Sequence, residues 1–166
     1  MISMVIENMI DFYKGNTRNI NHFLKVYAFA KTIGEQEGLD EGMQERLELS
    51  AVIHDIACPL CMEKYGNANG KLQEKESAAL VKAFLGELSL REELIERAAW
   101  VAAHHHTLSD QIDPADRGMD HQILLEADYL VNADEGGNSK EAVRQALTTL
   151  FRTESGKRLL CSMYQL

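Results

Sequence analysis

The scarcity of helix-breaking residues is the feature that most constrains this chain. Only two prolines, Pro59 and Pro114, occur in 166 residues, and apolar side chains recur at intervals of three and four. This spacing places them on one face of a helix, whereas a half-buried strand would alternate apolar and polar residues. The sequence therefore predicts an all-α fold, a compact bundle of roughly seven to eight helices.

Start and stop residues locate the expected helices. They are predicted over residues 2–13, from 16 or 17 to about 37, from 40 to a loop at Pro59, over about 72–85, near 121–133, near 139–151 and near 154–164. One further helix, with Ser89 as its expected cap, reaches the histidines at 104–106. Residues 58–70, which are rich in Gly and Asn, and residues 107–120 are predicted to be loops.

Length and composition limit the domain organisation. A chain of 166 residues that is 45% hydrophobic suits one globular domain, because domains usually contain ~100–150 residues. The motif-bearing core is expected at about 16–135, and C-terminal helices at about 139–165. No apolar run approaches the ~18 residues of a membrane span, and the first residues lack the pattern of a signal peptide. We therefore predict a cytoplasmic protein with no membrane partner.

The net charge restricts the partners. A formal charge of −9 and a pI near 5.1 argue against nucleic acid as the main partner, because binding to its backbone requires clustered Lys and Arg. An anionic substrate must then be held by a local site. Three cysteines without a secretion signal do not indicate a disulfide framework. The sequence leaves open whether the chain forms a homodimer.

Four ionisable side chains are predicted to point into the core. His22 shares a helical stripe with apolar residues four, seven and eleven positions later. His54 lies three and seven residues after apolar positions, and Asp55 lies about 100° further around the same inner side. Asp128 shares its face with leucines and a valine. Each of these positions alone is more typical of a hydrogen-bonded core residue than of a metal ligand.

Taken together, the four residues suit a metal site. Buried ionisable groups are costly unless something compensates them. Two neutral imidazoles and two carboxylates would hold a divalent transition metal ion such as Mn, Fe, Co, Ni or Zn, and would leave positions open for water and substrate.

The order of these residues resembles the HD-domain metal-dependent phosphohydrolase superfamily. A His, an HD pair, an HH element and an Asp follow one another on successive helices, within RNINHFLKVYAFAKTIG, LSAVIHDIA and LLEADYLVN. The resemblance covers roughly residues 16–135. It implies that His22, His54, Asp55 and Asp128 bind the metal and that the substrate is a nucleotide or another small phosphorylated metabolite. It also implies attack on the phosphate ester by a water that the metal activates.

The resemblance assigns further residues around the metal. Arg18 matches an arginine often found one turn before the first His, and it could hold a phosphate oxygen. A solvated surface arginine is the alternative. By spacing from Val101, the HH element corresponds to His104 and His105, with His106 as an extra histidine. These histidines could neutralise the phosphoryl group, or they could simply be solvated at a helix end.

The sequence departs from the family at Gln73. Members with several metals carry a His there, whereas this chain has Gln73 followed by Glu74, as in a branch of uncharacterised HD hydrolases. One tightly bound metal is therefore expected. Asp55 or Glu74 could take the proton of the attacking water. Alternatively, Glu74 serves only the first turn of its helix.

The sequence leaves two other functions open. The chain could be a diiron oxygenase, although the missing middle His counts against a two-iron site. It could also be a non-catalytic HD module that binds a ligand or has a regulatory role, although the complete ligand set counts against this.

Overall fold

The computed structural model describes residues 1–166 and is entirely helical, which confirms the predicted all-α fold. Nine α-helices and one short 3₁₀ turn follow in the order α1 (Ile2–Tyr13), α2 (Thr17–Gln36), α3 (Glu41–Ile53), α4 (Cys58–Tyr65), α5 (Gly70–Gly86), α6 (Glu92–Ala102), η1 (Ser109–Gln111), α7 (Met119–Glu135), α8 (Lys140–Thr149) and α9 (Glu154–Tyr164).

Side-chain caps explain where most of the helices begin. In five helices the residue before the first turn accepts a hydrogen bond from a backbone N–H of that turn, and these residues are Asn16, Asp40, Asn69, Ser139 and Thr153. Such oxygens satisfy N–H groups that have no partner within the helix. The sequence-based starts near 16, 40, 139 and 154 therefore agree with the structure.

Several predicted boundaries are wrong. The helix expected from 40 to Pro59 ends at Ile53, and the helix expected to reach the histidines at 104–106 ends at Ala102. Residues 58–65 form helix α4 rather than loop, because Pro59 lies in its first turn, where the missing N–H costs nothing. Ser89 does not cap α6. It adopts a left-handed conformation with φ 54°, and Arg91 precedes the first turn without a side-chain hydrogen bond.

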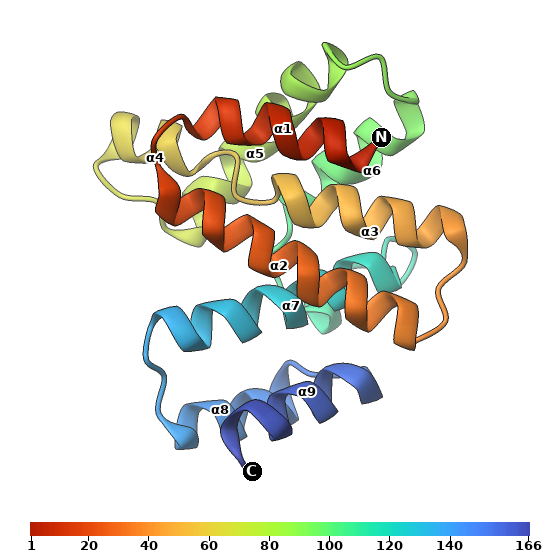
Figure 1. Ribbon diagram of the computed structural model, residues 1–166, viewed down its shortest axis with the longest axis vertical. Helices are drawn as coiled ribbons and strands as arrows, with labels where there is room; N and C mark the ends of the chain where they lie inside the picture. Colours follow the sequence, from red (N-terminus) through yellow and green to blue (C-terminus); the bar gives the residue numbers. More distant parts are fainter.

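The helices form three groups in space. In Figure 1, α2, α3 and α7 cross the middle of the molecule, with α1, α5 and α6 toward one end and α8 and α9 toward the other. Helix α2 packs against both α3 and α7, and α3 also contacts α7 and α6. The central three helices therefore meet one another, and the candidate ligands lie on or directly after them.

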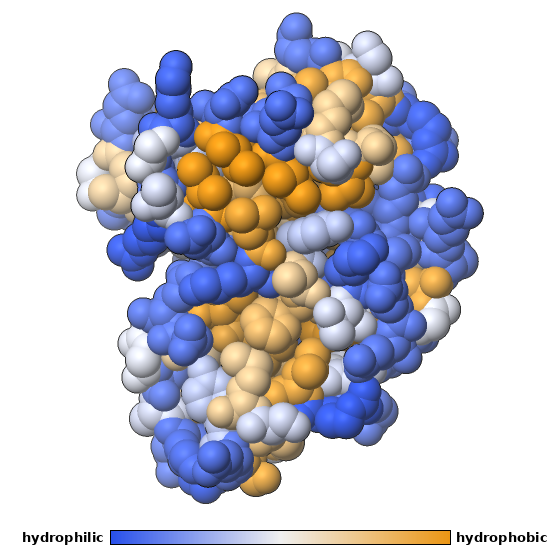
Figure 2. All heavy atoms as spheres, viewed as in Figure 1, coloured by the Kyte–Doolittle hydropathy of each residue, from blue (hydrophilic) through white to orange (hydrophobic).

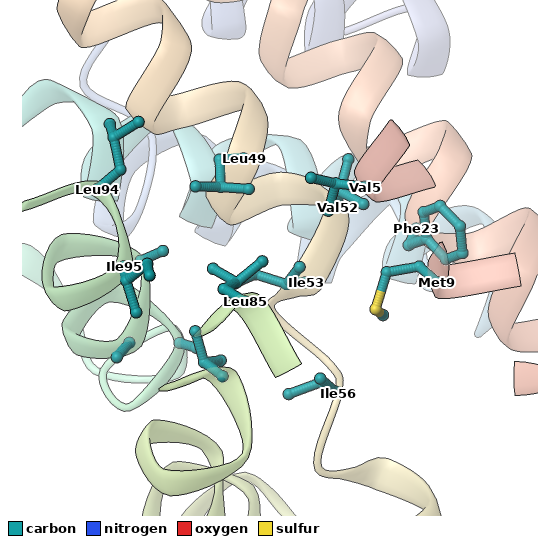
Figure 3. Close-up of a cluster of buried hydrophobic side chains, with 14 of the residues drawn as sticks. Val5, Met9, Phe23, Leu49, Val52, Ile53, Ile56, Leu85, Leu94 and Ile95 are labelled. Atoms are coloured by element: carbon teal, nitrogen blue, oxygen red, sulfur yellow. The ribbon is translucent and has the colours of Figure 1, made fainter. Parts of the chain in front are cut away.

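Two hydrophobic clusters fill the interior. The first joins α1, α2, α3, α5 and α6 and includes Met9, Phe23, Ile53 and Leu85 (Figure 3). The second joins α2 and α3 to α7, α8 and α9. Both clusters draw on α2 and α3, so these helices are held from two sides and offer rigid supports for polar side chains.

The surface is polar except for some patches. Figure 2 shows apolar side chains gathered over α1, where Met4, Ile10 and Phe12 are exposed. Exposed apolar residues as such are common on the surfaces of globular folds. No helix in the structure combines the length and the apolar character that crossing a bilayer requires.

Candidate metal centre

Three central helices bring the four predicted ligands together. Ligand atoms of His22, His54 and Asp128 all lie within 4.8 Å of one another. His22 Nε2 lies 3.2 Å from Asp128 Oδ1 and 3.4 Å from Asp55 Oδ2. His54 Nε2 lies 3.5 Å from each of the same two oxygens. Two imidazole nitrogens and two carboxylate oxygens therefore face one point.

Each histidine of the centre is oriented through its other ring nitrogen. His54 Nδ1 donates to the carbonyl of Ala51 at 2.9 Å, and His105 Nδ1 donates to the carbonyl of Ala102 at 2.6 Å. Both carbonyls lie three residues earlier, so the local backbone turn fixes the rings. A proton held at Nδ1 leaves the Nε2 lone pair free to bind a metal.

Unpartnered buried atoms test whether these residues fit a metal. His54 Nε2 and His105 Nε2 are buried and make no hydrogen bond, a state that is costly for a polar atom. Ligands ~2.1 Å from a shared transition metal would lie about 3.0–3.4 Å from one another. The separations of 3.2–3.5 Å are close to that range. The donor set therefore fits a divalent cation.

The carboxylates of the centre act on the protonation of its histidines. Burial disfavours the charged form of the His22 ring, but its hydrogen bond to Asp128 and the charges of Asp55 and Asp128 raise the pKa of His22 to about 9. Burial likewise acts to raise the pKa of Asp55, and the adjacent His54 and His105 reverse this and hold it well below its usual range. A metal that binds here would compete with the proton on His22, so its binding should depend on pH.

Asp55 also faces a second group of donors. Its Oδ1 lies 3.3 Å from His105 Nε2, and Asp55, His105 and His106 offer ligand atoms within 4.8 Å of one another. The two oxygens of Asp55 thus point to two neighbouring sets of histidines. The prediction that only one metal binds tightly stays a prediction.

The structure brings His106, rather than His104, into this second group. His104 stacks on Trp100 with ring centroids 4.3 Å apart, and its Nδ1 donates to the Trp100 carbonyl. The expected pairing of His104 with His105 therefore does not match the geometry. The reason is that residues 103–106 form a turn after α6 ends at Ala102, so helical spacing does not apply to them.

Gln73 and Glu74 make structural contacts. Gln73 is buried, accepts from the Cys58 thiol at 3.2 Å and donates to the carbonyl of Ala68 at 2.9 Å. Glu74 Oε1 accepts from the backbone N–H of His106 at 3.1 Å and from the Thr107 hydroxyl at 2.8 Å. Glu74 thus contacts the turn that carries His105 and His106.

A polar hollow lies beside the centre. Its volume is about 510 Å³, and it reaches His22 and Asp55. Arg18, Asn16 and Asn19, at the start of α2, also line it. Arg18 is exposed and lies one turn before His22, so its role in binding phosphate stays a prediction. The hollow therefore combines the candidate metal ligands with one cationic side chain.

Two further residues of α7 form hydrogen bonds with the predicted ligands, and neither was predicted from the sequence. Glu135 Oε2 accepts from His22 Nδ1 at 3.0 Å, and Asn132 donates to Asp128 Oδ1 at 2.8 Å. They follow Asp128 by seven and four residues, so helical periodicity already placed them on its face. That signal could have identified them.

Comparison with known proteins agrees with this geometry. The HD domain family matches residues 19–135 of the chain, from the first turn of α2 to the end of α7. The match includes all four predicted ligands and confirms the family resemblance drawn from the sequence. Searches among curated proteins and among solved structures gave no match.

Proposed function

Because the chain belongs to the HD domain family, we propose that it is a metal-dependent hydrolase of phosphate esters, acting on a nucleotide or another small phosphorylated metabolite. The observation that carries the proposal is the convergence of His22, His54, Asp55 and Asp128 beside a polar hollow that contains Arg18.

The four ligands would hold one divalent ion between α2, α3 and α7. When bound, such an ion lowers the pKa of water and polarises a phosphoryl oxygen. The protein's own contribution is to fix the donor atoms, because all three orienting Nδ1 contacts are in place before any ligand arrives. Preorganised donors avoid rearrangement during the reaction.

The surrounding side chains handle charge and protons. Arg18 reaches the hollow from the first turn of α2 and can donate to phosphate oxygens, which its planar guanidinium suits. Asp55 lines the hollow and faces both groups of histidines, which supports the proposal that it accepts the proton of an attacking water. His105, whose Nε2 lies 3.3 Å from Asp55 Oδ1, would also lie near the phosphoryl group.

The proposal is tested by metal analysis and by phosphate release. The purified protein is expected to contain a transition metal, and a panel of phosphomonoesters and nucleotides, assayed with Mn, Fe, Co, Ni and Zn, should include substrates. No hydrolysis with any metal would favour a non-catalytic module. Consumption of oxygen with iron would instead indicate an oxygenase.

The Asp55→Ala variant tests whether this centre binds the metal and carries out hydrolysis. The variant should lose both metal and hydrolysis while its circular dichroism stays helical, because a ligand is removed but the two hydrophobic clusters are not. Hydrolysis at the wild-type rate in this variant would show that the centre has been assigned to the wrong residues.

A further inference from the structure

A second, smaller hollow lies next to the same donors. Its volume is about 190 Å³, and it is bordered by His105 and Asp128 on one side. Four of its eight lining residues are apolar, namely Leu108, Leu125, Tyr129 and Leu150, and His106 and Asn132 complete the lining. Asn132 lines both this hollow and the polar one, so the two are neighbours across the centre.

The periodicity of α7 connects the apolar wall to the metal donors. Leu125, Asp128, Tyr129 and Asn132 are separated by three, four and seven residues and therefore share one face of the helix. On this face, Leu125 and Tyr129 lie beside Asp128 and line the smaller hollow. Asn132, one turn after Asp128, lines both hollows.

The apolar wall borders the second hydrophobic cluster, against which Tyr129 and Leu150 pack. Leu108, Tyr129 and Leu150 are only partly buried, although covering apolar surface is favourable. They come from the loop after α6, from α7 and from the end of α8. Three separate segments therefore leave apolar surface open at one point next to the donors.

We propose that this hollow binds the organic group of the substrate, a single ring or a short aliphatic chain. The inference rests on the proposed function, since it assumes that the phosphate lies at the centre beside Arg18. The volume limits the group's size, because 190 Å³ corresponds to about six water molecules. The site therefore selects small phosphomonoesters of apolar or aromatic alcohols over those of polar alcohols.

Substrate preference tests the assignment. The metal-loaded protein is assayed with phenyl phosphate and glycerol 3-phosphate, and the ratio of their kcat/KM values is measured for wild type, Leu150→Ser and Leu147→Ser. Leu147, in α8, is the matched control. Like Leu150 directly after that helix, it is partly buried and packs on the second hydrophobic cluster, but it does not line the hollow.

The wild type should prefer phenyl phosphate, and Leu150→Ser should reduce that preference roughly tenfold, the scale on which apolar pockets discriminate. Leu147→Ser should keep the wild-type ratio. Equal ratios in all three proteins, or equal loss in both variants, would overturn the assignment while leaving the proposed function intact.

Measuring the binding of phosphonates tests the apolar subsite independently of hydrolysis. Phenylphosphonate and methylphosphonate carry a C–P bond that phosphate-ester hydrolysis does not cleave, so their dissociation constants can be measured by calorimetry even if no ester is a substrate. Tighter binding of phenylphosphonate that is lost in Leu150→Ser supports the apolar subsite. Equal binding of the two phosphonates overturns it.

Discussion

His22 serves two sides of the centre through its two ring nitrogens. Nε2 faces Asp55 and Asp128, whereas Nδ1 donates to Glu135 at 3.0 Å. Lys25 donates to the other oxygen of Glu135 at 3.0 Å, which fixes this carboxylate in turn. A carboxylate behind a metal-binding His sets its tautomer and strengthens its lone pair. Glu135 is therefore a positioning residue for His22.

Replacing Glu135 should weaken metal binding without removing a ligand. In Glu135→Ala, His22 loses its orienting partner, and the affinity for the metal should fall roughly 10–100-fold, as measured by competition with a chelator. Asp134→Ala is the matched control, because this neighbouring carboxylate makes no hydrogen bond or ion pair. Unchanged affinity in Glu135→Ala would show that His22 needs no such support.

Among the individual site residues, those whose positions are set by helical periodicity could be predicted from the sequence. His22, His54 and Asp128 each lie on an apolar stripe, and a side chain on such a stripe must point inward whatever the tertiary packing. His106 could not be identified in this way, because it lies in a turn where no fixed angle separates successive residues. Its position depends on contacts with another helix.

That other helix is α5, which holds the turn after α6. Glu74 accepts hydrogen bonds from His106 and Thr107, and Gly70 lies against the His106 ring. A Cβ atom at Gly70 would lie 2.7 Å from that ring, so the ring would have to move. The first turns of α5 therefore set where His105 and His106 stand relative to Asp55.

Substitution of Glu74 distinguishes this positioning role from proton transfer. Glu74→Gln keeps an oxygen that can accept both hydrogen bonds, so its turnover should stay within about threefold of wild type, whereas Glu74→Ala should lose roughly tenfold or more because the turn is released. A catalytic base would instead lose roughly 10²-fold or more in both variants. Steady-state phosphate release with the tight metal still bound is the measurement.

An ion pair joins α6 to the start of α7. Asp120 is buried, and its two oxygens accept hydrogen bonds from Arg97 Nε and Nη2, both at 2.7 Å. Burial acts to raise the pKa of Asp120, but the hydrogen bonds and charge of Arg97 outweigh it and lower the pKa. The pair spans the loop between the two helices, and so supports the segment that follows the histidines.

The lowered pKa gives this pair a predictable dependence on pH. A carboxyl group with a lower pKa in the folded state contributes stability above its unfolded value, near ~3.9, and loses it as the pH falls through the folded value. Asp120→Asn should therefore reduce the free energy of unfolding by about 3 kcal/mol at pH 7, and by less at pH 3. Urea unfolding at both pH values checks this.

Asp116→Asn is the control for that measurement. Arg97 contacts Asp116 only through its backbone carbonyl, and the Asp116 residue is exposed. The control should match the wild type at both pH values. A difference between Asp120→Asn and wild type that stayed constant from pH 7 to pH 3 would contradict the assigned ion pair.

Element boundaries were predictable where a local signal decides them. Asn16 and Asp40 cap their helices through their own side chains, so a few neighbouring residues contain the information. Pro59 is ambiguous locally, because proline both ends a helix and occupies the first turn of the next one. Which of these applies depends on how α4 packs against α5.

At the scale of the whole molecule, the centre joins the two hydrophobic clusters. Its ligands come from α2, from the end of α3 and from α7, and α2 and α3 contribute apolar side chains to both clusters. Which helices pack together could not be predicted from periodicity, since every amphipathic helix offers a similar apolar face. The His and Asp ligands supplied that information, because one ion requires them to meet.

Metal removal should therefore lower the stability of the entire fold. A ligand that binds only the folded state at 100 times its Kd adds about 2.7 kcal/mol, which corresponds to roughly 5–11 °C in Tm for a chain of this size. Calorimetry of the metal-loaded and chelator-treated protein should show this difference in a single transition. Two separate transitions, with only one moving on chelation, would mean that the metal stabilises one cluster alone.

In Asp55→Ala the metal-dependent shift should nearly vanish, because the Asp55 carboxylate that faces both His22 and His54 is missing. A full shift in that variant would place the stabilising ion at another site.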